Sequence, residues 1–342
     1  MVHPALRDEK MQSYARFIAA EVEAHLEDWA EAGECDLLAT MNEITIRTAG
    51  RCLIGAEFRG GLASEFARLY HDLEGGINMI AFFAPYLPLP AMRRRDRARR
   101  RVAELMSDLI AARRAALAPT DDFLDTLMAA RDEKGRPLGD DTITGLLLTL
   151  LFAGQHTSAV LATWTGVLLL ENPRHLGPVL AEQAAVLGAQ GMTLAALKQL
   201  ATLERSIKEA ERMHPPLVML MRKVIEDFEF NGHVVPAGDL AMVSPAISHE
   251  IPEVFSDPRR FDRERFAPPR EEDRRTPYAL IGFGGGKHRC IGLAFAYQQV
   301  KVIWSVLLKR YRFSLIGDNQ RPNYATFVVG PRQPCLVSYR RR

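Results

Sequence analysis

Apolar residues recur every three to four positions along much of the chain, which is the spacing of amphipathic helices. Near the start, the residues that share one helical face are Leu6, Met11, Tyr14, Ile18, Val22, Leu26 and Trp29. The same spacing predicts helices over 36–56, 64–73, 93–117 and 197–213. After residue 217 the pattern changes to short runs, one of them a hairpin with Asn231-Gly232 at its turn, and residues 327–329 are predicted to form a further strand. The pattern therefore predicts a mainly α fold with small β-sheets.

The longest apolar segment, residues 142–170, contains no Asp, Glu, Lys or Arg. About 20 apolar residues cross a bilayer, so a membrane span is one interpretation. However, residues 153–158 (A-G-Q-H-T-S) would place polar groups near the middle of the bilayer, where they are costly. A helix that is apolar all round is also what the centre of a large soluble domain requires. We therefore expect a buried helix, with a membrane protein as the alternative.

Composition limits the possible functions. The chain has 342 residues, 47% of them hydrophobic, which suffices for one large or two medium domains. Its 44 Lys and Arg nearly balance 42 Asp and Glu, so nucleic-acid binding has no compositional support. Four scattered cysteines and a charged N-terminus without a signal peptide fit a soluble protein of the reducing cytoplasm. The arginine-rich run at 93–101 could attract a redox partner or anionic lipid, but a solvated helix face explains it more simply.

The stretch with the clearest chemistry is 278–301, where Cys290 lies between a glycine-rich, basic loop and a helical pattern that begins at Ile291. The dipole and free N–H groups of a helix N-terminus stabilise negative sulfur. Cys290 is therefore a candidate ligand for a soft metal site. A lone cysteine is more often a small core residue, and it is the loop in front of it that favours a ligand.

That loop has the features of a surface for a flat cofactor. Its glycines would let backbone approach closely: Gly282, Gly284, Gly285 and Gly286. Phe283 could lie against the cofactor's face, and three basic residues could meet its carboxylates: Lys287, His288 and Arg289. A phosphate-binding loop is excluded, because it needs Gly at position 281 and Ser or Thr at 288, where Ile281 and His288 stand.

The pattern F-x-x-G-x-H-x-C-x-G, from Phe283 to Gly292, resembles the cysteine loop of the cytochrome P-450 family, the haem-thiolate monooxygenases. The resemblance runs from about residue 5 to the end and is closest to bacterial-type sterol 14α-demethylases (lanosterol 14α-demethylases). It implies one haem-binding domain over residues 1–342, lacking the N-terminal sheet and first helices of the family's fold. It also implies heme b (iron protoporphyrin IX), with Cys290 as iron ligand. The residues implied to contact the haem are Cys290, Arg222, His288, Phe283, Gly284 and Gly154.

The polar cluster in the uncharged segment has a functional interpretation of its own. Small Ala153 and Gly154 would let a bulky group approach the helix, and the Thr157 hydroxyl beside the His156 imidazole could relay protons to bound oxygen. The plainer alternative is two core residues with satisfied hydrogen bonds. A-G-Q-H-T-S resembles the family's oxygen-activation motif, as found in its sterol 14α-demethylase branch. The resemblance implies that His156 pairs with a glutamate on an earlier helix, which is Glu74 here.

Glu209 and Arg212 are three residues apart, so they share a helix face and can form an ion pair. An isolated pair of this kind usually lies at the surface and contributes little. Here it resembles the family's E-x-x-R motif, which is buried and held by an arginine from a later loop. Arg265, in R-E-R-F, fits that third position. The resemblance implies that this triad is structural and not catalytic.

The resemblance also implies a substrate and partners. A sterol-like molecule would lose its 14α-methyl group, with O2 and with electrons from a ferredoxin or reductase. The residues implied to line its pocket are Ala153, Leu217, Leu220, Phe327 and Val328. Two alternatives stay open beside the membrane protein: a monooxygenase of another apolar substrate, such as a steroid or fatty acid, and a haem-binding but catalytically incomplete fragment.

Overall fold

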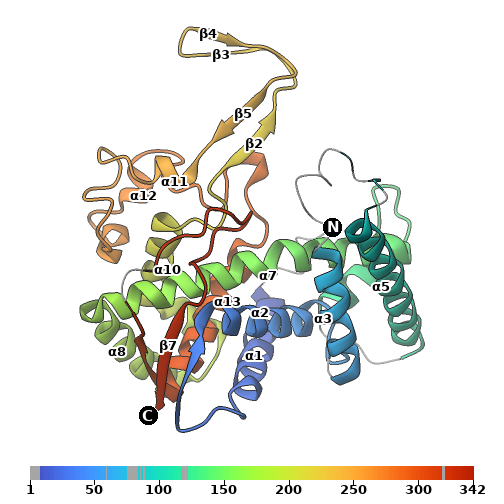
Figure 1. Cartoon of the computed structure of the whole chain (residues 1–342), viewed down its shortest axis with the longest axis horizontal. Helices are drawn as coiled ribbons and strands as arrows, with labels where there is room; N and C mark the ends of the chain where they lie inside the picture. The colour runs from blue at the N-terminus through green and yellow to red at the C-terminus, as the bar shows by residue number, and fades with distance from the viewer. Residues whose placement is uncertain are drawn as a thin grey trace. The chain divides into compact units, whose positions relative to one another are not determined.

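The computed structural model describes residues 8–58, 60–74, 84, 86–87, 89–116, 120, 122–317 and 320–342. The α-helices among them are α1 (Asp8–His25), α2 (Leu37–Leu53), α3 (Gly60–Glu74), α5 (Pro90–Ala115), α6 (Phe123–Ala129), α7 (Asp140–Glu171), α8 (Pro173–Gln190), α9 (Leu194–Gln199), α10 (Ala201–Met213), α11 (Pro245–Ser248), α12 (Glu272–Arg275) and α13 (Leu293–Arg310) (Figure 1). The strands are β1 (Ala32–Asp36), β2 (Leu220–Lys223), β3 (Phe228–Phe230), β4 (His233–Val235), β5 (Leu240–Val243), β6 (Tyr311–Leu315) and β7 (Leu336–Arg341), with short 3-10 helices η2 (Arg263–Phe266) and η3 (Gly286–His288). The prediction of a mainly α fold with small sheets is confirmed.

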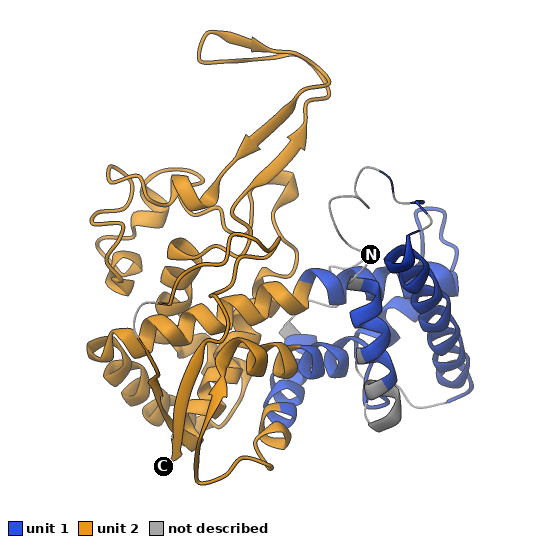
Figure 2. Ribbon diagram, in the orientation of Figure 1, with its two compact units in different colours: residues 1–21, 46–153 blue, residues 22–45, 154–342 orange. Residues whose placement is uncertain are grey.

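The chain forms two compact units (Figure 2). Unit 1 contains residues 1–21 and 46–153, and unit 2 contains residues 22–45 and 154–342. The boundaries fall inside α1, α2 and α7, so each of these helices contributes residues to both units.

Unit 1 is built on the packing of α3 against α5. Val102, Met106 and Ile110 lie on one face of α5, and all three are buried in one apolar cluster with Phe66 of α3. Arg97, Arg99, Arg100 and Arg101 of the arginine-rich run point the other way and are exposed, whereas Arg113 near the end of the helix is buried. The arginine-rich run is therefore the solvated face of an amphipathic helix, as its spacing predicts.

The second half of α7 runs through the core of unit 2. Every residue from 158 to 169 is buried, including Thr163 and Thr165, whose hydroxyls donate to backbone carbonyls one turn earlier at 2.7 Å. By length and composition α7 could also cross a membrane. The surrounding protein accounts for the missing charges in this half, since a helix enclosed on all sides has no polar face. The prediction of a buried helix is confirmed for these residues.

The sheets are small and antiparallel. β1, β7 and β6 form one three-stranded sheet, and β2 pairs with β5. β3 and β4 form the hairpin expected from the sequence, with Asn231 at φ 51° and Gly232 at φ 79° in its turn. This hairpin and the β2–β5 ladder extend away from the helices of unit 2 (Figure 1).

The prediction of a strand at 327–329 is wrong. These residues follow a turn in which the hydroxyl of Thr326 donates to the carbonyl of Asn323 at 2.9 Å, and Val329 N–H donates to Pro216 O at 2.8 Å without a ladder. The short apolar run is bent by the turn that precedes it. β1 was not expected, because A-G-E-C-D carries no alternation of apolar residues.

Candidate functional site

Cys290 lies in a loop of unit 2, between η3 and α13. It is a free, exposed thiol, and its N–H donates to the carbonyl of Phe283 at 2.8 Å, which closes the loop. The turn favours Gly284, which has φ +70°, and a Cβ there would stand only 3.1 Å from the carbonyl oxygen of His288. The helix begins at Leu293, two residues later than the sequence pattern predicts. Ile291 is 45% exposed and is therefore not part of the buried helix face that the apolar spacing suggests.

Burial separates Cys290 from the other three cysteines. Cys52 and Cys335 are buried, and burial raises the pKa of the Cys335 thiol to about 12 and that of Cys52 further. Burial also raises the pKa of Cys35. Since only a thiolate is a good metal ligand, these three thiols are poor candidates, and Cys290 is the one of the four that is exposed.

The basic residues expected near the cofactor are all exposed. Lys287 and His288 lie on η3 and Arg289 follows it. Arg222 is on β2, and its guanidinium donates to the carbonyl of Met221 at 2.7 Å. Within the described part of the chain Arg222 has no ion pair, so its charge is available for an anionic group.

Behind the loop lies a buried carboxyl group that the sequence did not suggest. Glu211 of α10 is 3% exposed and accepts a 2.5 Å hydrogen bond from the hydroxyl of Tyr297 on α13. Burial raises the pKa of Glu211 to about 7. Residues 209–212 of α10 are all buried, and no pattern in the sequence singles out Glu211 among them.

The predicted proton-relay residues lie on α7 at the start of its portion in unit 2. His156 is half-buried, and its Nδ1 lies 3.2 Å from Oδ1 of Asn42 on α2. Because that oxygen can only accept, Nδ1 carries the proton in this arrangement. Gln155 donates to the same oxygen at 3.3 Å. Asn42 is thus a partner of the polar cluster that no sequence pattern identified.

The other residues expected near this cluster are placed as follows. Thr157 is half-buried next to His156, and Gly154 is half-buried with open space where a Cβ would stand. Ala153 is exposed and is the last residue of unit 1. Glu74 is the final residue of α3, also in unit 1, and its side chain lies outside the described residues. The pairing of His156 with Glu74 therefore stays a prediction.

The three residues of the expected triad form a buried ionic network. Arg212 donates to both oxygens of Glu209, at 2.8 and 2.9 Å, and Nε of Arg265 donates to Glu209 Oε1 at 3.0 Å. All three side chains are fully buried. Arg265 also donates to Glu272 at 2.7 Å, and Arg212 to the carbonyl of His249 at 3.0 Å. The network joins α10 to η2 and α12, far from solvent.

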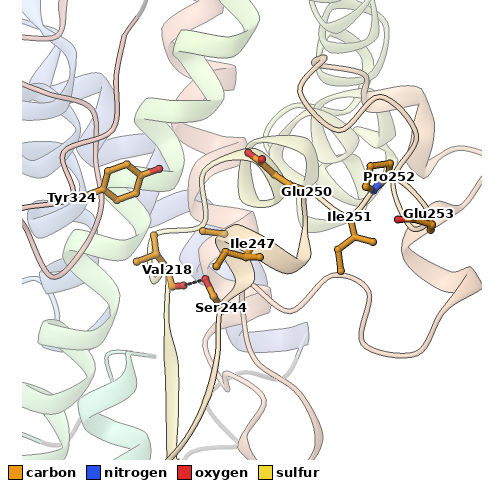
Figure 3. Close-up of a pocket in the computed structure, with 9 residues that line it drawn as sticks. Val218, Ser244, Ile247, Glu250, Ile251, Pro252, Glu253 and Tyr324 are labelled. Atoms are coloured by element: carbon orange, nitrogen blue, oxygen red, sulfur yellow. Dashed lines mark hydrogen bonds between the residues drawn. The ribbon is translucent and has the colours of Figure 1, made fainter. Parts of the chain in front are cut away.

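The residues predicted to line the substrate pocket are spread over three segments. Leu217, Leu220 and Val328 are half-buried, and Phe327 is 86% exposed. Next to them is a groove of about 630 Å³, lined by Val218, Ser244, Ala246, Ile247, Glu250, Ile251, Pro252, Glu253 and Tyr324 (Figure 3). Its floor is tied by a 2.7 Å hydrogen bond from Ser244 to Val218 O. Two carboxylates at its rim make it a less apolar site than a sterol pocket needs.

Comparison with known proteins gives a consistent result. The chain is 43% identical to the sterol 14α-demethylase of Mycobacterium tuberculosis, over all of this chain and 78% of that protein. It is 36% identical to the lanosterol 14-alpha demethylase of Mus musculus, over 97% of this chain and 66% of that protein. Among solved structures, retinoic acid bound cyanobacterial CYP120A1 has a TM-score of 0.90 and 25% identity, covering all of this chain and 77% of that one. The cytochrome P-450 family model matches residues 1–337, which span both units. The chain belongs to the cytochrome P-450 family.

Proposed function

We propose that this protein is a sterol 14α-demethylase in which Cys290 is the thiolate ligand of the haem iron. As a member of its family it is a haem monooxygenase, and the 43% identity to a sterol 14α-demethylase over the full chain carries the choice of substrate. The second support is the chemistry of the thiols, since Cys290 is the exposed one of the four.

The residues present fit a haem. A flat porphyrin needs an accessible sulfur, a surface without bulky side chains and cations for its two carboxylates. Cys290 offers the sulfur, and the space beside Gly154 is open. Arg222 and His288 are exposed and basic, and a guanidinium can bind a carboxylate through two hydrogen bonds. Phe283 is half-buried and could lie against the ring.

When bound, the haem supplies the oxidative chemistry and accepts electrons from a redox partner. Cys290 would hold the cofactor and donate electron density to its iron. The Thr157 hydroxyl and the His156 imidazole would move protons toward the site. Asn42, which accepts from Nδ1 of His156, fixes the ring so that the other nitrogen, Nε2, is the proton acceptor.

The pairing of His156 with Glu74 belongs to the same proposal. A carboxylate close to the imidazole would place a second group able to carry a proton beside it. We likewise propose that Ala153, Leu217, Leu220, Phe327 and Val328 contact the sterol. O2 is the second substrate, and a ferredoxin or a reductase delivers the electrons. The protein would act in the cytoplasm as a soluble enzyme.

The test begins with the carbon monoxide difference spectrum of the reduced protein. We expect a strongly red-shifted Soret band in the wild type and its loss in Cys290→Ala, with Cys52→Ala as the control that keeps it.

Titration with a 14α-methyl sterol and with a fatty acid then tests the substrate. Tight binding of the sterol with release of its 14α-methyl group supports the proposal, whereas binding of the fatty acid alone would identify a different apolar substrate. A red-shifted band without turnover would indicate a catalytically incomplete protein.

A further inference from the structure

The buried carboxyl of Glu211 lies directly against the backbone of the Cys290 loop. A Cβ built on Gly282 would stand 2.6 Å from both Cγ and Oε1 of Glu211. No side chain larger than hydrogen fits at position 282 while Glu211 keeps this position. The absence of a side chain at position 282 therefore allows Glu211 to pack against the loop, and its carboxyl group occupies the space immediately behind it.

Three successive contacts lead from Glu211 to Cys290. The hydroxyl of Tyr297 donates to Oε2 of Glu211 at 2.5 Å. The ring of Tyr297 packs on Phe283 with their centroids 5.8 Å apart and their planes tilted by 55°. The carbonyl of Phe283 accepts the N–H of Cys290 at 2.8 Å. A change at Glu211 therefore acts on the segment that sets the position of the sulfur.

The polar groups that shift the pKa of Glu211 come from α10, α12, α13 and the Cys290 loop. Lys208 of α10 donates to Asp273 of α12 at 2.8 Å, and Arg289 follows η3 in the loop. Lys208, Arg289 and the Tyr297 hydroxyl lower the pKa of Glu211, Asp273 raises it, and burial is the largest influence and leaves it at about 7.

Tyr297 stays a neutral donor throughout the physiological range. Burial, Glu211, Glu204 and Asp273 all raise the pKa of its hydroxyl well above the ordinary value. The proton that is gained or lost near neutral pH is therefore on the carboxyl group, and the hydroxyl can donate to either form of it.

We propose that Glu211 and Tyr297 are a positioning pair for the Cys290 loop, and that the charge on Glu211 lowers the reduction potential of the iron that Cys290 binds. The inference rests on the proposed function. A buried anion opposes the uptake of an electron by a nearby metal, because the medium around it screens charge poorly. An enzyme of this kind would be harder to reduce above neutral pH than below it.

The test is a redox titration of the haem-loaded protein between pH 5.5 and 8.5. In the wild type, we expect the midpoint potential to fall as pH rises through about 7, with a change on the order of tenfold in the reduction equilibrium constant. Glu211→Gln keeps a hydrogen-bond acceptor but cannot ionise, so its potential should stay at the high, acidic limit. Glu104→Gln, which removes an exposed carboxylate of α5, is the matched control and should behave as the wild type.

Tyr297→Phe gives an independent check. It removes a hydrogen bond that lowers the pKa of Glu211, so the step in potential should move to higher pH. It should also increase the share of reduced protein that lacks the red-shifted carbon monoxide band. The inference is overturned if the wild type shows the red-shifted carbon monoxide band but neither Glu211→Gln nor Tyr297→Phe changes the dependence of the midpoint potential on pH. A wild type without the band would instead remove the ligand assigned to Cys290, and the inference with it.

Discussion

The indole of Trp304 occupies the space that a side chain at Gly166 would fill: a Cβ there would stand 1.9 Å from Cζ2 of the ring. Trp304 also donates from Nε1 to Ala162 O at 2.8 Å, so α13 is locked onto α7 by packing and by a hydrogen bond. The helix that begins just after Cys290 is thereby held against the helix that carries His156.

Gly166→Ala is expected to destabilise the protein. The methyl group would displace a fully buried ring in a close-packed core, which costs about 1–3 kcal/mol or more. The matched control is Gly145→Ala on the same helix, where a Cβ meets nothing within 4 Å. That change should raise stability by about 0.5–1 kcal/mol, because Gly weakens a helix interior relative to Ala. Denaturant unfolding of both variants measures the difference, and equal stabilities would contradict the packing described.

Glu209→Gln is expected to cost about 3–5 kcal/mol, because it leaves two buried guanidinium groups short of their shared counter-charge. Exposed Glu104, which pairs with Arg101, provides the comparison. Glu104→Gln should change stability by less than about 1 kcal/mol. Thermal unfolding of the two variants tests this. A small effect at Glu209 would mean that Glu272, which pairs with Arg265, and the carbonyls bound by Arg212 are enough to balance the two guanidinium groups.

Acid should destabilise the protein through His249. Burial lowers the pKa of His249 from its ordinary value of 6.5 to about 4. Its Nε2 accepts from Ile281 N–H at 3.0 Å, while Nδ1 lies 3.1 Å from Arg212 O. Since the unfolded state binds the proton more readily, this contribution is intact above pH 6.5 and is lost as pH falls toward 4.

The variant His249→Gln should flatten the loss of stability between pH 6.5 and 4, while His233→Gln on the exposed hairpin should leave it as in the wild type. Urea unfolding at a series of pH values gives the slope. His214, whose pKa burial also lowers to about 4, contributes in the same direction, so some slope remains in either variant. An unchanged slope in His249→Gln would show that folding does not lower the pKa of this imidazole.

Asn42→Ala is expected to reduce turnover about tenfold with little loss of haem, because His156 loses the acceptor that fixes its ring. Asn42→Asp keeps an oxygen at the same place and should retain more activity. Product formation per electron consumed, measured beside haem content, separates a role in proton delivery from a loss of folding. Full activity in Asn42→Ala would remove Asn42 from the site.

The sequence predicted best those features whose periodicity and chemistry agree. The buried stretch of α7 follows from a run without charges, and the ion pair of Glu209 and Arg212 follows from their spacing on one helix. The partners supplied by distant segments could not be predicted. Asn42 lies 114 positions from His156, and Tyr297 lies 86 positions from Glu211.

Local sequence patterns were also misleading where contacts between distant segments determine the backbone conformation. The apolar run at 327–329 has the composition of a strand but finds no neighbouring strand to pair with among the described residues, and a turn shapes it instead. β1 is the opposite case, because its sequence does not predict a strand. It becomes one by pairing with β7, some 300 positions away.

The chain passes from one unit to the other within α1, α2 and α7, and this limits how the protein can be dissected. No single cut in the gene yields either unit, since each is assembled from two separate stretches of sequence. The chain also passes between the units within helices, so the connections offer a protease no exposed loop of the kind at which it usually cleaves between two units. Fragment complementation, with the break placed in a surface loop such as 131–137, is therefore the practical way to obtain the molecule in pieces.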